Sequence, residues 1–253
     1  MKAHRIEVIV FLAFTGCVPK ATNVTMSGTV YDVPNAAGSV VGGATVRTLD
    51  GTGALVEEAT TDEGGAFTAA VPAGEGFFVQ VDGPSGEGYV PTAFSGTAGL
   101  NDFDAGIGFP WVAAPDWFAA LQADWAGCPG ADVAGVPGSG VAVVGEVRMW
   151  MNISDIDMMP LQVGADVVVS PASGVEVSGC YHDGDGAYDP TATGTGPDGL
   201  FAVFGIAPGT ASGGLAATIE YDDTSGVRRP VIYQYTAEDG GLVPIYPTFV
   251  YDE

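Results

Sequence analysis

Short stretches in which apolar and polar residues alternate recur along the chain and predict β-strands. Residues 77–82 and 215–221 alternate in this way, as half-buried strands do, and residues 228–235 are predicted to form a long last strand. Thirty-nine glycines and 17 prolines are scattered between such stretches and suit tight turns. With hardly any helical pattern between them, these strands predict an all-β protein of antiparallel sandwiches.

The strand pattern occurs twice. The spacing between matching residues grows from 117 (Gly28 to Gly145) to 134 (Phe67 to Phe201), so we interpret the copies as duplicated domains with unequal loops. The matching segments are 26–30 and 143–147, 41–46 and 163–167, 61–67 and 195–201, and 71–74 and 207–209.

Each copy contains the motif Thr-x-x-x-Gly-x-Phe, at residues 61–67 and 195–201. We expect a tight turn whose glycine adopts a positive φ, followed by a strand that its phenylalanine anchors in the core. Gly28 and Gly145 each stand two residues before a valine, where a strand with close packing is expected.

These segments resemble the carboxypeptidase regulatory-like domain, a transthyretin-like β-sandwich related to the immunoglobulin architecture. The resemblance rests on 28–30, 43–46, 61–67, Pro72 and Gly74 in the first copy and on 145–147, 164–167, 195–201 and 208–209 in the second. It implies two Ig-like, transthyretin-like sandwiches, at 25–102 and 141–253, joined by a helical linker segment at 103–140. It also implies a binding, spacing or stabilising role and transfers no catalytic residue.

One helix is predicted between the copies, within residues 114–127. Trp117, Leu121 and Trp125 stand four residues apart and share a helical face, while Pro115 suits the first turn. This stripe either packs against the sandwiches and cements them, or forms an aromatic platform for a ligand. Residues 129–140, which are rich in Gly, Pro and Ala, are predicted to be a linker.

The N-terminus predicts export. Residues 1–16 combine a basic start, a short apolar run and a small residue before Cys17, as in a signal peptide, and the run is too short to span a bilayer. Cys17 after Thr-Gly resembles the bacterial lipobox, which implies acyl chains on Cys17, a tether at 17–24 and the lipid bilayer as a partner. Val18 favours the outer membrane by analogy. The alternative is an ordinary signal peptide with Cys17 incidental.

The chain is strongly acidic. Without residues 1–16 it loses Lys2, Arg5 and Glu7, which leaves five basic and 30 acidic residues and a formal charge of −25. Phosphate binding needs clustered Lys and Arg, so nucleic acid is excluded as a partner. Charged residues make up only 15% of the chain and apolar residues 47%, so a packed core is feasible.

Two cysteines remain besides Cys17. Cys128 and Cys180 would meet an oxidising compartment after export, where a disulfide can form. The alternative is two separately buried thiols.

Catalytic arrangements are scarce in the sequence. His182 is the one histidine after the signal sequence, and no Gly-x-Ser-x-Gly motif is present. We expect His182 to be a solvated loop side chain, and we expect no enzyme activity and no cofactor, although 30 acidic residues leave carboxylate pairs possible.

The loop 180–189 is the best candidate for a metal site. Asp183, Asp185 and Asp189 alternate with glycines and could direct hard oxygens at one Ca²⁺. The alternative is an acidic solvated turn, because Asp-Gly pairs are ordinary turn formers.

Together these features predict a non-catalytic, lipid-anchored envelope protein that acts as a structural or protein-interaction module. The alternative is a carbohydrate-binding surface lipoprotein, since exposed aromatic rings on sandwiches can stack on sugars. Partners would then be envelope proteins or glycans. The candidate rings are Trp111, Trp150, Tyr31 and Tyr188.

Overall fold

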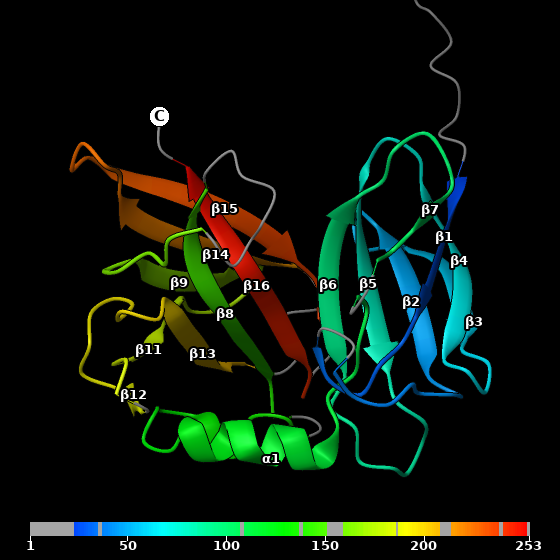
Figure 1. Ribbon diagram of the computed structural model, residues 1–253, viewed down its shortest axis with the longest axis horizontal. Coiled ribbons are helices and arrows are strands. Elements are labelled where there is room, and N and C mark those ends of the chain that lie inside the picture. Colours follow the sequence, from blue (N-terminus) through cyan, green and yellow to red (C-terminus); the bar gives the residue numbers. More distant parts are fainter. Residues whose placement is uncertain are drawn as a thin grey trace, which may run out of the picture.

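The computed structural model is built mainly of β-strands, which form two sandwiches side by side, and its described residues include one short α-helix (Figure 1). The all-β prediction is therefore confirmed. The signal sequence, Cys17 and the tether up to residue 22 lie outside the described residues. The structure describes residues 23–34, 37–106, 109–136, 139–150, 159–185, 187–207, 214–237 and 240–251.

The first sandwich packs a sheet of order β4-β1-β7 against strands of order β3-β2-β5-β6. The core lies between the layers, where Met26 and Val71 of one sheet join Val46 and Val79 of the other in one buried cluster. β1 runs antiparallel to β4 and parallel to β7. The strands are β1 (Asn23–Thr29), β2 (Thr45–Asp50), β3 (Leu55–Thr60), β4 (Ala66–Pro72), β5 (Gly76–Asp82), β6 (Thr92–Thr97) and β7 (Phe103–Asp104).

The second sandwich repeats this plan and adds a hairpin. β13-β8-β16 face β10-β9-β14-β15, and β11 and β12 extend the first of these layers beyond β13. Val143 and Phe201 on one side meet Val167 and Ile219 on the other in a second buried cluster. The strands are β8 (Val141–Trp150), β9 (Asp166–Pro171), β10 (Val177–Ser178), β11 (Cys180–His182), β12 (Tyr188–Asp189), β13 (Leu200–Ile206), β14 (Leu215–Asp222), β15 (Arg228–Tyr235) and β16 (Leu242–Tyr251).

The strand pairings of the two sandwiches correspond one to one. β1 with β4 and β7 in the first matches β8 with β13 and β16 in the second. β2 between β3 and β5 likewise matches β9 between β10 and β14. The repeat seen in the sequence is thus a repeat of strand order.

A continuous sheet joins the sandwiches. β16 lies between β8 and β6, runs parallel to both and pairs Leu242 with Thr92, so that nine strands form one sheet across both copies. The backbone N–H of Leu242 donates to the carbonyl of Pro91 at 2.7 Å. The prediction that residues 228–235 form the last strand is wrong, because β16 follows them.

In the first copy a buried threonine, Thr61, lies where the chain crosses from β3 in one sheet to β4 in the other. The Thr61 hydroxyl donates to the carbonyl of Val41 at 2.7 Å and accepts the N–H of Ala44 at 2.9 Å. The backbone of Thr61 bonds Ala44 and Gly43 as well. We call this arrangement the threonine clasp.

The second copy has the same clasp around Thr195. Its hydroxyl donates to the carbonyl of Gln162 at 2.6 Å and accepts the N–H of Ala165 at 3.0 Å, and its backbone bonds Ala165 and Gly164. Every bond of the first clasp therefore recurs at the matching residue of the second.

The turn after each clasp has the predicted geometry. Gly65 and Gly199 adopt φ of 76° and 67°, a region that favours glycine because it has no side chain. The following phenylalanines, Phe67 and Phe201, are buried in the two cores, as expected.

The helix α1 (Pro115–Asp124) and the residue that follows it pack against residues of both sandwiches. Trp125 is buried at its end and packs against Phe204 of β13 with ring centroids 5.0 Å apart, while Trp117 packs edge-on to Trp111 at 5.3 Å. Trp117 and Leu121 are partly buried against the same core. Of the two interpretations of the stripe, the packing role is confirmed.

Described parts of the segment between the copies pack against the sandwiches. Phe103 pairs with Met26 through β7, and Trp111 forms a bridge with Tyr31, so the described residues 103–106 and 109–113 run along the first sandwich. After α1, a short 3₁₀ helix, η2 (Ala131–Val133), buries Ala131 against the core.

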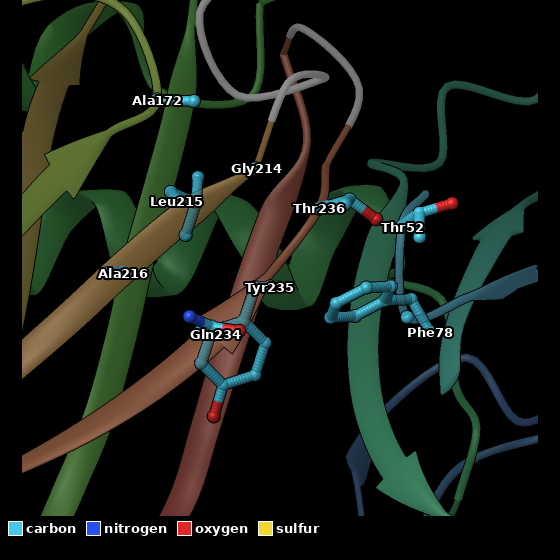
Figure 2. A pocket seen from close by; sticks show the side chains of 10 residues that line it. Thr52, Phe78, Ala172, Gly214, Leu215, Ala216, Gln234, Tyr235 and Thr236 are labelled. Carbon is cyan, nitrogen blue, oxygen red and sulfur yellow. The ribbon is translucent and has the colours of Figure 1, made fainter. Parts of the chain in front are cut away.

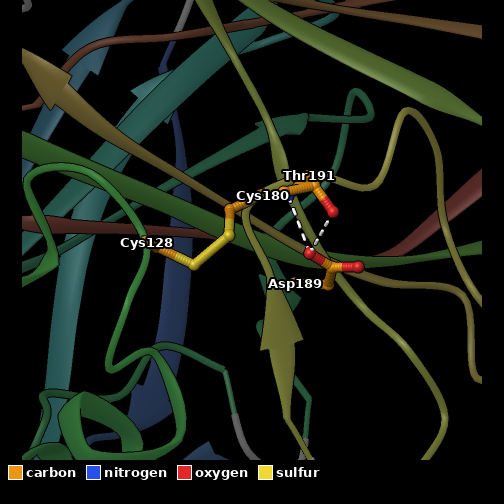
Figure 3. Close-up of a disulfide and its surroundings, with 4 residues drawn as sticks. All are labelled: Cys128, Cys180, Asp189 and Thr191. Atoms are coloured by element: carbon orange, nitrogen blue, oxygen red, sulfur yellow. Dashed lines mark hydrogen bonds between the residues drawn. A yellow bond between two sulfur atoms is a disulfide. The ribbon is translucent and has the colours of Figure 1, made fainter.

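A disulfide joins Cys128 to Cys180, as predicted, with Cα atoms 6.1 Å apart. It links the loop after α1 to the start of β11 (Figure 3). The disulfide thus fastens the added hairpin to the segment that follows α1.

Candidate functional site

The predicted metal-binding loop is a hairpin of β11 and β12 whose acidic residues bond their own turns. Asp183 Oδ1 accepts the N–H of Asp185 at 2.7 Å. Asp189 Oδ1 accepts both the N–H and the hydroxyl of Thr191, each at 2.7 Å (Figure 3). The Thr191 hydroxyl, together with backbone N–H groups, lowers the pKa of the Asp189 carboxyl. One oxygen on each of Asp183 and Asp189 is therefore already used within the loop.

No metal centre is assembled in the part of the chain that the structure describes, which omits Gly186 of this loop. Within it, no group of three or more His, Cys, Asp or Glu side chains is placed to hold a metal ion. Binding of Ca²⁺ by Asp183, Asp185 and Asp189 stays a prediction.

His182 has defined partners, so the expectation of a solvated side chain is wrong. Its Nδ1 lies beside a carboxylate oxygen of Asp198 and accepts the N–H of Gly184 at 3.2 Å. Its ring packs edge-on to Tyr188 with centroids 5.2 Å apart. These contacts hold the His182 side chain beside Asp198.

The aromatic rings suggested for sugar stacking are not available together. Trp111 is buried between Phe94 and Trp117, which contradicts its use as an exposed platform. Tyr31 and Tyr188 are half-buried and belong to different sandwiches. The side chain of Trp150 lies outside what the structure describes.

A hollow of about 270 Å³ lies where the two four-stranded layers meet (Figure 2). We call it the inter-sandwich hollow. The β2–β3 turn and β5 form its wall in the first sandwich, and the ends of β9, β14 and β15 form its wall in the second. It is lined by Gly51, Thr52, Phe78, Ala172, Gly214, Leu215, Ala216, Gln234, Tyr235 and Thr236.

Thr236 gives the hollow an unpartnered polar group. The residue is only 5% exposed, and its Oγ1 has no hydrogen-bond partner. In Figure 2 this oxygen points toward the side of the hollow where Thr52 and Phe78 lie. A buried hydroxyl without a partner costs about 1–3 kcal/mol of desolvation free energy, so the position is unfavourable unless something enters to bond it.

Tyr235 also lines the inter-sandwich hollow. Burial raises the pKa of its phenol, and its hydrogen bond with Ser95 of β6 acts in the opposite direction. The phenol is therefore neutral at physiological pH and connects β15 of the second sandwich to β6 of the first. None of the lining residues within the described ranges carries a charge.

The hollow was not predicted from the sequence. Its lining residues are small or ordinary, and they come from five separate segments of the chain. Nothing in a sequence marks a hydroxyl that lacks a partner, because the lack arises only when the segments pack.

Neither a protein-family model nor a curated protein sequence matches the chain. Among solved structures it is similar to the Bacillus anthracis TIE protein, with 15% identity and a TM-score of 0.28. That match covers 91% of this chain but only 34% of the Bacillus protein, so this chain spans about a third of its length.

Two pilin structures are also similar. The minor pilin GBS52 of Streptococcus agalactiae has 11% identity over 91% of this chain and 96% of that chain, with a TM-score of 0.27. The shaft pilin SpaA of Lactobacillus rhamnosus GG, as its E269A mutant, has 11% identity over 89% and 96%, with a TM-score of 0.26. Similarity at this level does not indicate what this chain does.

Proposed function

We propose that this protein is a non-catalytic, lipid-anchored component of the cell envelope, whose paired sandwiches serve as a rigid structural or protein-interaction module. The observation that carries the proposal is the joint between the copies. One sheet crosses it, α1 packs into a buried cluster that also contains Phe204 of the second sandwich, and a disulfide holds the added hairpin.

Rigidity follows from the nature of these links. The sheet crosses the joint by main-chain bonding at Leu242 and Pro91, which side-chain motion does not disrupt. Trp125 and Phe204 pack together in a buried cluster that both sandwiches share, and Tyr235 of the second sandwich bonds Ser95 of the first. Two domains on a flexible linker would have none of these contacts.

The anchoring part of the proposal rests on residues 1–17. A short tether after an acylated Cys17 would keep the first sandwich near the bilayer, since β1 begins at Asn23. Two or more acyl chains give stable anchoring where a single chain does not. Among the described residues, no helix is long and apolar enough to cross a membrane.

Anchoring is tested by detergent phase partition of cells that produce the protein. We expect the wild type in the detergent phase and a Cys17→Ala variant in the aqueous phase or as an unprocessed precursor. Cys180→Ala is the matched control, because it removes a cysteine without touching the lipid site. Equal partition of wild type and Cys17→Ala would refute anchoring.

The rigid-module part is tested by native-state hydrogen exchange on the purified protein. If the copies form one unit, the amide of Leu242 exchanges as slowly as amides of the central strands β5 and β14. Exchange at Leu242 that is much faster than at both of these strands would show that the joint opens by itself, and would contradict the proposal.

A further inference from the structure

We propose that the inter-sandwich hollow binds one ring of a neutral saccharide, with the Thr236 hydroxyl as its central hydrogen-bonding group. The inference rests on the geometry of the hollow and does not depend on lipid anchoring. It assigns sugar recognition to a place that contains none of Trp111, Trp150, Tyr31 and Tyr188.

The first argument is the unsatisfied hydroxyl. Thr236 Oγ1 is buried without a partner, although the buried hydroxyls of Thr61 and Thr195 each make two hydrogen bonds. A hydroxyl can donate and accept at once, and so can the hydroxyls of a sugar. An apolar ligand would leave Thr236 as it is.

The second argument is the charge of the lining. The chain has a formal net charge of −24, yet none of the lining residues that the structure describes is charged. An anionic ligand would be repelled by the surrounding field and would find no cation among the described residues of the hollow. Among the described lining residues a cation would find no carboxylate to pair with, so these residues favour a neutral ligand.

The third argument is the mixture of surfaces. Phe78 and Leu215 present apolar surface, while Thr52 and Gln234 add an exposed hydroxyl and an exposed amide. A sugar ring has the same mixture, with C–H groups on its faces and hydroxyls around its edge. A few placed polar groups within an apolar lining are typical of small-molecule sites.

Size and position limit the ligand. Sites for drug-sized molecules measure about 300–1,000 Å³, so a hollow of about 270 Å³ suits a single ring with the rest of a glycan outside. Both sandwiches supply lining residues, so a bound ring would touch both. Binding should therefore be sensitive to the joint.

The test is an NMR titration of the ¹⁵N-labelled protein with D-glucose, D-galactose and N-acetyl-D-glucosamine, and with D-glucuronate as the charged counterpart. We expect at least one neutral sugar to shift the amides of Thr52, Gln234 and Thr236 in a saturable way. Glucuronate should shift them much less at equal concentration.

Three variants locate the binding. Thr236→Val keeps the shape and removes the hydroxyl, so we expect affinity to fall about tenfold without loss of thermal stability. Ala216→Phe fills the hollow and should abolish binding. Thr61→Val is the matched control, since it removes a buried, fully bonded hydroxyl far from the hollow and should lower stability but leave affinity within about twofold.

Several outcomes would overturn the proposal. These are no saturable shift with any neutral sugar, shifts confined to residues outside the hollow, unchanged affinity in Thr236→Val, or glucuronate binding as well as the neutral sugars. If Thr236→Val did not fold, the affinities of Ala216→Phe and Gln234→Ala would show whether sugar binds in the hollow. Gln234 is exposed, so its replacement should not disturb folding. A hollow that holds water alone would appear as the first outcome.

Discussion

The two sandwiches share a clasp but differ in the length of chain that the clasp closes. Thr61 bonds Ala44 across 17 residues, whereas Thr195 bonds Ala165 across 30. The bonds themselves are the same. The clasp is therefore set by local residues, and the extra chain is accommodated elsewhere.

In the second copy the extra chain is held by two additional interactions, a disulfide and a His–Asp contact. Its insert forms the β11–β12 hairpin, which Cys180 joins to Cys128 and which His182 joins to Asp198 before β13. The first copy has a direct route from β3 to β4 and needs neither. A longer loop costs more entropy to close, and a covalent cross-link offsets part of that cost.

Removal of the disulfide should produce the largest difference in stability between the two sandwiches. A Cys128→Ala, Cys180→Ala double variant opens a cross-link with a sequence separation of 52 residues, and the chain-entropy model assigns this about 4 kcal/mol of unfolding free energy. Urea unfolding of the variant measures this loss, and hydrogen exchange should place the greatest gain in mobility in the second copy. A variant as stable as wild type would contradict the role of the cross-link.

Alanine at the matched glycines should give the next largest difference. A Cβ on Gly145 would lie 2.3 Å from the carbonyl oxygen of Ile245, which is backbone of β16, and 2.7 Å from the Phe201 ring. On Gly28 the nearest atom would be the Phe67 ring at 2.8 Å, with no backbone contact as close.

We therefore expect Gly145→Ala to lower the unfolding free energy by about 3 kcal/mol and Gly28→Ala by about 1 kcal/mol. Thermal and urea unfolding of both variants checks this order. A larger loss of unfolding free energy in Gly28→Ala would mean that β16 moves away from an added Cβ more easily than β4 does. That result would weaken the view that β16 is fixed in the joint.

Removal of the clasps should give nearly no difference between the copies. Thr61→Val and Thr195→Val each leave one buried N–H and one carbonyl without the hydroxyl, at a cost of about 2 kcal/mol. Equal losses in urea unfolding would support equivalent clasps. A loss confined to one variant would show that the longer loop changes what its clasp contributes.

The features predicted well from the sequence were those with a local cause. The Thr-x-x-x-Gly-x-Phe turns depend on a glycine conformation and a nearby apolar anchor, so their φ angles and buried rings followed directly. The helix between the copies and the pairing of Cys128 with Cys180 were predicted from spacing and redox compartment.

The features missed depend on distant contacts. Pro244 and Pro247 argue against a strand at 242–251, because proline lacks the N–H that a sheet needs. The structure accommodates them with a register shift between Ile245 and Thr248, where β16 departs from regular pairing with β8. The carbohydrate hypothesis failed at Trp111 because the sequence does not show which rings face water.

The place of β1 has a mechanical consequence. It is the first described element after the segment proposed as the tether, and it lies between β4 and β7, with seven residue pairs to β4 alone. A pull directed along this strand would load those pairs in shear, so they would have to give way together and not one at a time. The first sandwich would then resist a pulling force applied through the proposed N-terminal tether.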